Sequence, residues 1–356
     1  MMGQIIKVKG AKRLREKEVI PFTRQLASML GAGMTILASI QTLGEQSSNA
    51  EFKKVLKHLG DVIEGGAPMS TGLADYPQLF DDMYVNMVIA GEQSGEFAGI
   101  MKRLASILQS SSRLKKKVKS AMTYPTVIVS IAFLLAAGLI QFVVPVFAEM
   151  FNGFGKKLPW LTQMLVNVSE FVKSWWYVIG GTFVAVLFLF KRWKATAAGH
   201  LAFDRFKLKL PIFGLLSQKA AIGRFCRLLA QMVAAGVPIL KSLEVVAGSL
   251  DNYVLENSVL AARKEVEQGN QLSPSLQGKP FMPILMVRML AAGEKAGKVE
   301  DMLESVADSY DEEVEMMLAT LTSLMEPFLM VFLGLIIGTI VTAMFLPIFN
   351  LGSLAK

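Results

Sequence analysis

The sequence predicts an all-α integral membrane protein in which one helical domain occurs twice and three helices cross the bilayer. Hydrophobic residues make up 53% of the chain and charged residues only 19%, and the mean hydropathy is +0.45. This composition is typical of a protein that lies partly in lipid and partly in water. No stretch shows the sustained alternation of apolar and polar residues that a half-buried strand would need.

The chain begins with a basic, polar tail over residues 1–18, followed by a predicted helical domain over 19–120. The tail lacks the apolar core of a cleaved signal peptide, so we expect it to stay in the cytoplasm. In the domain, the apolar residues Ile36, Ile40 and Leu43 recur at helical spacing. The tail and the domain are therefore assigned to one side of the membrane.

Three apolar stretches, 121–147, 171–193 and 321–349, are predicted to span the membrane. About 20 apolar residues cross the hydrocarbon as a helix, and each stretch is long enough. The first is uncharged, and the third carries Glu326 near its start. The second has aromatic residues at one edge and cations at the other, as is usual for residues anchored at a membrane interface.

Lysine and arginine residues near the span ends predict the orientation. They gather before the first span and after the second, whereas few lie in the loop 148–170 or the tail 350–356. The domains 19–120 and 194–320 are therefore placed in the cytoplasm, and the loop and the C-terminal tail in the periplasm. The cations that decide this are Arg113, Lys115, Lys116, Lys117 and Lys119, then Lys191, Arg192, Lys194, Arg205, Lys207 and Lys209.

The chain contains a tandem duplication. The pairs 203 residues apart include Phe22 and Phe225, Gly33 and Gly236, Gly66 and Gly269, and Ser70 and Ser273; those 202 apart include Gly91 and Gly293, Glu92 and Glu294, Gly95 and Gly297, Pro125 and Pro327, and Pro145 and Pro347. Each copy is a helical domain followed by a span, and the unmatched second span returns the chain to the cytoplasm. Ser70 and Ser273 follow turn-like stretches and are predicted to be helix N-caps.

Each copy carries an Ala-Gly-Glu-x-x-Gly motif, centred on Glu92 in the first and Glu294 in the second. The second motif runs into Lys298 and so resembles a phosphate-binding loop. It has one residue too few between its glycines, and Val299 stands where Ser or Thr is required, so nucleotide binding is rejected. Two interpretations stay open. Either the glycines allow helices to approach closely while the glutamate caps a neighbouring helix or meets a cation, or the motif is a docking surface.

The prolines of the first and third spans lie twenty residues apart in both copies, which is roughly 30 Å of helix and matches the hydrocarbon thickness. They either mark the two ends of each span or introduce a kink near the outer face that shapes a groove for a partner helix. Glu326 occupies the position of Tyr124 in the first copy. It is either a solvated interface residue or a functional group, since ionisable residues in membranes are costly.

The two copies differ in charge just before their spans. The first is cationic over 113–119, whereas the second is acidic over 311–315. The cationic stretch either binds anionic lipid or pairs with the acidic one, within the chain or on another subunit.

The residues that most often build catalytic or metal sites are few. The chain has one cysteine and two histidines, too scattered for a disulfide, a zinc site or a Cys–His pair. Cys226 is predicted to be buried, His58 to be a solvated helix residue and His200 to lie in a loop. We expect no cofactor, no metal and no enzymatic activity.

Together these motifs resemble the GspF/PilC family, the inner-membrane platform proteins of type II secretion and type IV pilus machines. The resemblance covers almost the whole chain. Its residues are Phe22, Arg24, Gln25, Leu26, Ala27, Ala32, Gly33, Gly91, Glu92, Gly95, Lys119, Ala121, Tyr124 and Pro125, then Phe225, Leu229, Ala230, Ala235, Gly236, Gly293, Glu294, Gly297, Glu326 and Pro327.

The resemblance implies two cytoplasmic bundles of about six helices each, in a multi-pass protein of the bacterial inner membrane. It implies that they bind an assembly or retraction ATPase and couple it to the insertion or removal of pilin or pseudopilin subunits. Other inner-membrane assembly subunits, membrane lipid and further copies of the chain are expected partners; nucleic acid is not. The alternative is a transporter or permease built from parallel repeats, which would need polar or broken helices at the midplane.

Overall fold

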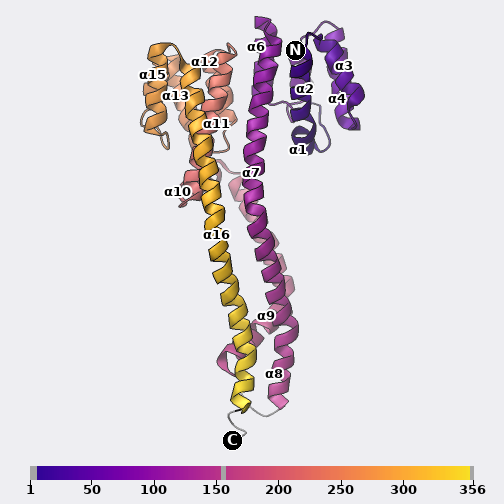
Figure 1. The fold of residues 1–356 in the computed structure, drawn as a ribbon, viewed down its shortest axis with the longest axis vertical. Coiled ribbons are helices and arrows are strands. Elements are labelled where there is room, and N and C mark those ends of the chain that lie inside the picture. The colour runs from indigo at the N-terminus through magenta and orange to yellow at the C-terminus, as the bar shows by residue number, and fades with distance from the viewer. Residues whose placement is uncertain (1–5, 154–157, 353–356) are drawn as a thin grey trace. The chain divides into compact units, whose positions relative to one another are not determined.

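The computed structural model describes residues 6–153 and 158–352, and all the regular structure in these residues is helical (Figure 1). The predicted all-α class is confirmed. The chain divides into two compact units. The first contains the residues up to Lys116 together with Leu201–Val314, and the second contains Lys117–His200 together with the residues from Glu315 onward.

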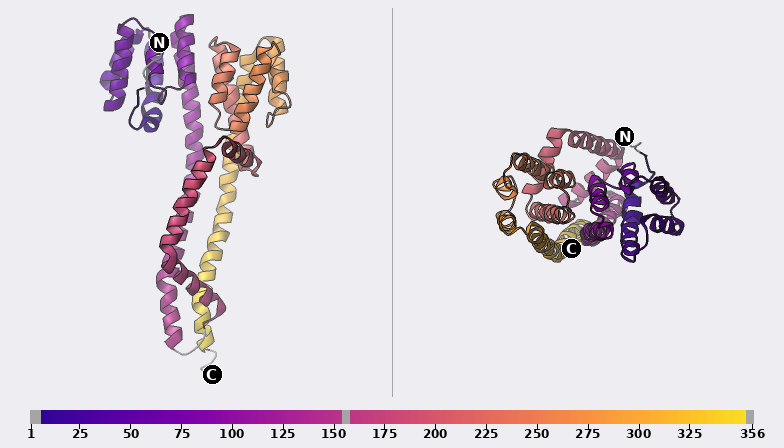
Figure 2. Two further views of the ribbon diagram at one scale, coloured as in Figure 1. Left: turned by 180° about the vertical axis from the view of Figure 1, so that it is seen from behind. Right: turned by 90° about the horizontal axis from the view of Figure 1, so that it is seen from above.

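The first unit holds both copies of the repeated domain, which stand side by side (Figure 2). The helices of the first copy are α1 (Ala11–Leu14), the π-helical turn η1 (Arg15–Val19), α2 (Ile20–Gly31), α3 (Ile36–Gln46), α4 (Ala50–Glu64), α5 (Met69–Ala74), α6 (Asp82–Ser94) and the start of α7 (Phe97–Gly138). Those of the second are α10 (Ala197–Lys209), α11 (Phe213–Ala234), α12 (Ile239–Gly248), α13 (Tyr253–Glu267), α14 (Leu272–Leu276), α15 (Ile284–Ala296) and the start of α16 (Val299–Gly352). Helices α3–α7 and α12–α16 begin at equivalent residues, so the predicted duplication is structural as well as sequential.

Glycines with positive φ end the equivalent helices of the two copies. Gly33 and Gly236 adopt φ of 86° and 78° just after α2 and α11. The next residue then donates its N–H back to a carbonyl of the last turn, from Met34 to Met29 at 3.1 Å in the first copy. This arrangement satisfies helix-end carbonyls and needs a residue without a Cβ. The repeated glycines are therefore required by the turns.

The core of the first copy is aromatic. The Phe22 ring meets the rings of Phe52 and Phe80 edge-on, with centroids 5.6 Å and 6.4 Å away. The Tyr84 ring meets the Phe80 ring edge-on, and the Tyr84 hydroxyl shares a hydrogen bond of 3.0 Å with the hydroxyl of Thr23. This hydrogen bond satisfies two polar groups that would otherwise be costly to bury.

The predictions for the isolated cysteine and histidines had mixed outcomes. Cys226 is fully buried in α11, as predicted. His58 is helical as predicted, but it is half-buried, with its Nε2 3.1 Å from Oδ2 of Asp75. The loop assignment of His200 was wrong: it lies in α10, because the chain turns at Ala195 and Thr196, immediately after α9 (Trp160–Lys194), and re-enters a helix at Ala197.

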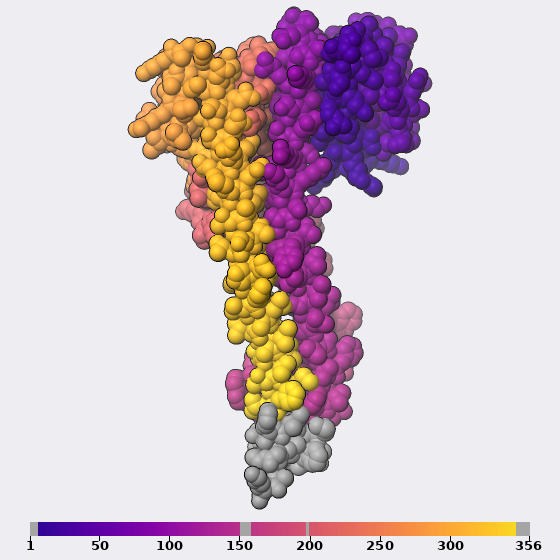
Figure 3. All heavy atoms as spheres, viewed as in Figure 1, coloured from indigo at the N-terminus to yellow at the C-terminus, as the bar shows by residue number. Residues whose placement is uncertain are grey.

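The second unit contains the apolar helices. Its elements are the continuation of α7, the π-helical turn η2 (Leu139–Val143), α8 (Val144–Gly153), α9 and the remainder of α16. Three of the helical stretches are long and apolar enough to cross a membrane. In this unit the side chains of α7 and α16 lie against each other (Figure 3). All three predicted spans lie within these helices.

The stretch 148–170, predicted to be a loop, is helical over residues 148–153 and 160–170. Helix α8 continues to Gly153, and α9 begins at Trp160. Val144, Ala148 and Val166 pack together, and the Thr162 hydroxyl donates a hydrogen bond to the carbonyl of Ala343. Packing of α8 against α9 stabilises helix in this stretch, and a local sequence pattern does not show that contact.

Neither α7 nor α16 is interrupted at the predicted boundaries 120/121 and 320/321. Helix α7 has 42 residues and α16 has 54. Pro125 lies inside α7, and Pro327 and Pro347 lie inside α16. Pro145 follows two residues after η2, and Pro21 likewise follows two residues after η1. A wider π turn relieves the clash between a proline ring and the carbonyl four residues earlier.

Replacing Gly66 with alanine should destabilise the protein, because Gly66 has a φ of 82° after α4. An L-residue in this conformation costs about 1–2 kcal/mol. Gly60→Ala is the matched control. Gly60 lies inside α4 with nothing within 4 Å of an added Cβ, so alanine there should add about 0.5–1 kcal/mol. Thermal unfolding followed by circular dichroism in detergent measures both. Equal midpoints would contradict the role assigned to Gly66.

Candidate functional site

The two Ala-Gly-Glu-x-x-Gly motifs occupy equivalent positions at the ends of α6 and α15. In each copy the glutamate lies in the last turn of its helix, and the next long helix begins two residues beyond the final glycine. The motif therefore joins a short helix to one that runs on toward the membrane-spanning unit.

The glutamate of each motif caps a helix that lies earlier in the chain. Glu92 accepts hydrogen bonds from the Ser70 N–H at 3.1 Å and from the Ser70 hydroxyl. Glu294 accepts the N–H of Leu272 at 2.7 Å and that of Ser273 at 3.2 Å. These are unsatisfied first-turn amides of α5 and α14, and a carboxylate there also meets the positive end of the helix dipole. The helix-capping interpretation of both glutamates agrees with this geometry.

The prediction that Ser70 and Ser273 are N-caps was wrong. Both lie inside their helices, and the residues at the N-cap positions, Pro68 and Gln271, provide no side-chain cap. The missing acceptor comes from the glutamate about 22 residues downstream. A local sequence pattern cannot reveal a cap supplied by another helix.

The glycines of the motif have two different roles. A Cβ on Gly91 would lie 3.2 Å from the Cβ of Ile100, and one on Gly293 would lie 3.0 Å from the carbonyl oxygen of Lys298. These two glycines permit close approach, as predicted. Gly95 and Gly297 have open space around them but adopt φ of 75° and 66°. The prediction of close approach was wrong for this second pair, whose role is conformational.

The acidic stretch of α16 pairs mainly with α11 of its own copy. Arg227 donates to Asp308 at 2.7 Å and to Asp311 at 2.6 Å, and Lys219 pairs with Glu313. Burial alone would lower the pKa of Arg227, but its hydrogen bonds to Asp311 and Asp308 raise it. The unlike charged stretches also meet, since Lys117 of α7 pairs with Glu315 of α16.

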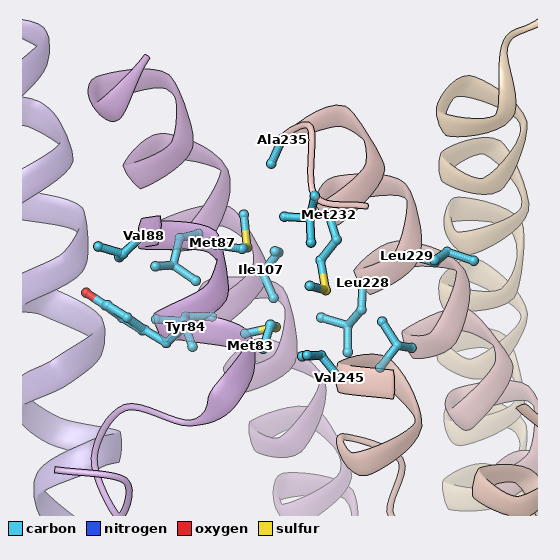
Figure 4. Packing of buried hydrophobic residues seen from close by; sticks show 14 of the residues in the cluster. Met83, Tyr84, Met87, Val88, Ile107, Leu228, Leu229, Met232, Ala235 and Val245 are labelled. Atoms are coloured by element: carbon cyan, nitrogen blue, oxygen red, sulfur yellow. The ribbon is translucent and has the colours of Figure 1, made fainter. Parts of the chain in front are cut away.

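The two copies meet through apolar side chains within the first unit (Figure 4). Met83, Met87 and Ile107, from α6 and α7, face Leu228, Met232 and Val245, from α11 and α12. All six are less than 9% exposed. The contact therefore belongs to one continuous core that the two copies share.

The span residues singled out in the sequence differ in exposure. Tyr124 is 52% exposed in α7, whereas the neighbouring Pro125 is buried. Glu326 and Pro327 are exposed on α16, and Pro145 is half-buried in α8. The side chain of Pro347 lies outside the described residues. Exposure of Glu326 is compatible with both of its interpretations, and the groove is still a prediction.

Comparison with known proteins places both copies in one family. Residues 22–145 and 225–347 match the family described as "Type II secretion system (T2SS), protein F". The chain is 38% identical over 345 residues to the type IV pilus assembly protein PilC of Pseudomonas aeruginosa, covering 97% of this chain and 92% of that protein. It is 37% identical over 347 residues to the type IV pilus assembly protein TapC of Aeromonas hydrophila, covering 97% and 84%. It is 30% identical over 333 residues to the type II secretion system protein F of Vibrio cholerae, covering 93% and 82%.

Replacing Glu92 or Glu294 with alanine should lower stability, because first-turn amides of α5 or α14 lose their acceptor. The expected cost is about 1–3 kcal/mol, the range for hydrogen bonds to charged groups. Gln93→Ala, at an exposed position of the same helix α6, should stay within about 0.5 kcal/mol of the parent. Thermal midpoints in detergent test this. A Glu92→Ala protein of unchanged stability that fails to bind its partners would instead favour the docking interpretation.

Proposed function

This chain belongs to the type II secretion system protein F family, and from that membership we propose that it is the inner-membrane platform of a type IV pilus or type II secretion machine. Three apolar helices and the family make it an inner-membrane protein. The relatives' names, as pilus assembly proteins and a secretion system component, support an assembly role rather than an enzymatic one. Coupling to an ATPase is the further step of the proposal.

The proposed topology places the N-terminus and both repeated domains in the cytoplasm and the C-terminus in the periplasm. Its support is the lysine and arginine residues that lie before the first span and after the second. With this topology the two domains face the compartment that holds ATP and an assembly or retraction ATPase. Pilin or pseudopilin subunits, other inner-membrane assembly subunits and anionic lipid are the proposed partners at the membrane.

The observation that carries the coupling is the continuity of α7 and α16 from the domains into the spans. At 1.5 Å per residue, the 42 residues of α7 and the 54 of α16 correspond to about 63 Å and 81 Å of helix. A displacement of either domain by an ATPase would reach the membrane without crossing a flexible linker. The same helices then act on the apolar helix of a pilin-type subunit within the bilayer.

The platform itself is proposed to turn over no substrate. Cys226, the single thiol, is fully buried, and burial raises the pKa of this thiol, so it supplies no thiolate at neutral pH. Burial, together with nearby Cys226 and Glu313, raises the pKa of Tyr310 to about 12, so its phenol stays protonated. These two side chains thus serve packing rather than proton transfer.

Affinity purification of the tagged protein from membranes in mild detergent, followed by mass spectrometry, should recover a cytoplasmic ATPase together with pilin or pseudopilin subunits. An unrelated three-span inner-membrane protein with the same tag is the control. The identity of the subunits recovered would separate a pilus from a secretion machine. Recovery of the protein alone, under conditions that preserve such complexes, would contradict the platform function and direct attention to a transport assay.

Breaking helix α7 should uncouple the machine without releasing the ATPase. A Gly-Gly-Ser-Gly insertion after Ser120 puts a flexible joint between the first domain and its span, so filament assembly or secretion should fall to background while the ATPase still co-purifies. The same insertion between Ser47 and Ser48, in the turn between α3 and α4, is the control and should leave activity near the parent level. Full activity with the Ser120 insertion would exclude mechanical coupling through α7.

A further inference from the structure

The contact between the two copies is a head-to-tail contact, in which each copy uses a different face. The first copy contributes α6 and the start of α7, and the second contributes α11 and α12 (Figure 4). Contacts of this kind leave one face of each copy unused. The same contact can therefore be repeated with further molecules. The assembly is a ring if the rotation that relates successive copies brings the last copy back to the first.

The duplication identifies the two unused faces. Helix α15 is the counterpart of α6, and α2 with α3 are the counterparts of α11 with α12. The first unused face, the α15 face, contains Ile284, Leu285 and Met289; the second, the α2–α3 face, contains Gln25, Met29, Ala32 and Met34.

Equivalent residues differ sharply in exposure between the used and the unused faces. Met83 is 4% exposed in the contact, whereas its counterpart Leu285 is 59% exposed. Ile284, beside Leu285, is 72% exposed. On the other side, Leu228 is 5% exposed, whereas its counterpart Gln25 is exposed. Large apolar side chains grouped in this way usually mark an interaction surface.

We infer that the α15 face of one molecule binds the α2–α3 face of a second copy of this chain, repeating between molecules the contact made within each. The methionine pair of the contact recurs on the unused faces, whereas Gln25, Thr42 and Ser309 stand at the positions equivalent to Leu228, Val245 and Ile107. Met87 and Met232 are buried opposite each other, and their counterparts Met289 and Met29 are again methionines, half-buried on the α15 and α2–α3 faces. Methionine adapts readily to an imperfectly matched surface.

A second copy fits these faces better than another protein because repetition of the contact keeps every span in one bilayer. In the first unit, the starts of α7 and α16 run in the same direction (Figures 1 and 2). Repeats that are parallel in this way are related by an axis along the membrane normal. Applying the same relation again adds molecules side by side within the membrane.

The inference deepens the proposed function, since it rests on the self-association expected of the platform and names the surface for it. Two differently tagged chains are co-expressed, one carrying Gln25→Cys and the other Leu285→Cys. These residues are the counterparts of Leu228 and Met83, which lie in the contact within the chain. Both positions are exposed, so the substitutions should leave folding intact. Cys226 can remain, because it is fully buried and does not react.

A short bis-maleimide added to membranes should join the two tagged chains, giving a product that carries both tags. Lys264→Cys, at an exposed position of α13 in the same copy as Leu285, replaces Leu285→Cys in the control and should give at least tenfold less product. A second variant, Leu285→Glu, should shift the mass of the purified particle, measured by light scattering, toward that of a single chain. Its thermal midpoint should not change.

Four results would overturn the inference. Products between two Leu285→Cys chains would show a symmetric contact through α15. Cross-links from Leu285→Cys to another protein, identified by mass spectrometry, would show a different occupant. An oligomer that forms without the Gln25–Leu285 product would place self-association on another surface and leave the platform function standing. If the unsubstituted protein purifies as a single chain, the self-association expected of the platform is itself contradicted.

Discussion

The structure depends first on the requirement that every backbone amide and carbonyl inside a bilayer has a partner in the protein. A chain that enters the membrane as a helix meets this requirement most simply if the helix begins in water and continues without a break. Helices α7 and α16 follow this route, since both start in the first unit and end in the second. The membrane requirement thus fixes how the domains are joined to the spans.

The paired glutamates show how the domains keep the starts of those long helices in place. Helices α5 and α14 have six and five residues, too few to be stable alone. Their first amides are held by Glu92 and Glu294, which belong to the helices that immediately precede α7 and α16. Each motif therefore links three helices. Its glutamate caps the short helix, its first glycine allows the close approach, and its second glycine makes the left-handed turn into the long helix. A partner that displaces one of these helices would shift the others with it.

The duplication has kept the backbone and changed the electrostatics. The second copy ties α11 to α16 through Arg227 and Lys219, which meet acidic residues of α16. The first copy has the uncharged residues Ser106, Gln109 and Ser111 at the equivalent positions of α7, and its cations begin only at Arg113. Exposed ion pairs contribute little to stability, so these differences act more on which surfaces can meet than on whether the domain folds. They make the two copies distinguishable to any partner, although their folds correspond helix by helix.

Much of the architecture could be predicted from the sequence because it depends on local or periodic signals. Helical spacing, the three apolar stretches and the repeated glycines report on the residues that carry them, and the burial of Cys226 follows from its apolar neighbours. The failures are of another kind. The cap on α5 was assigned to Ser70, and the helical residues 148–153 and 160–170 were missed. In both cases the deciding partner lies far along the chain: Glu92 for α5, and Val166 for Val144 and Ala148.

The sequence by itself determined the all-α class, the number and position of the apolar spans and the duplication. Only the tertiary structure decided what Glu92 and Glu294 bind, which acidic residues of α16 are used within their own copy, and which face of each copy is covered by the other. The physical reason is that periodicity and composition describe what one segment can do alone. Capping, ion pairing and burial between copies depend on groups that folding brings together from about 20 to more than 140 residues apart.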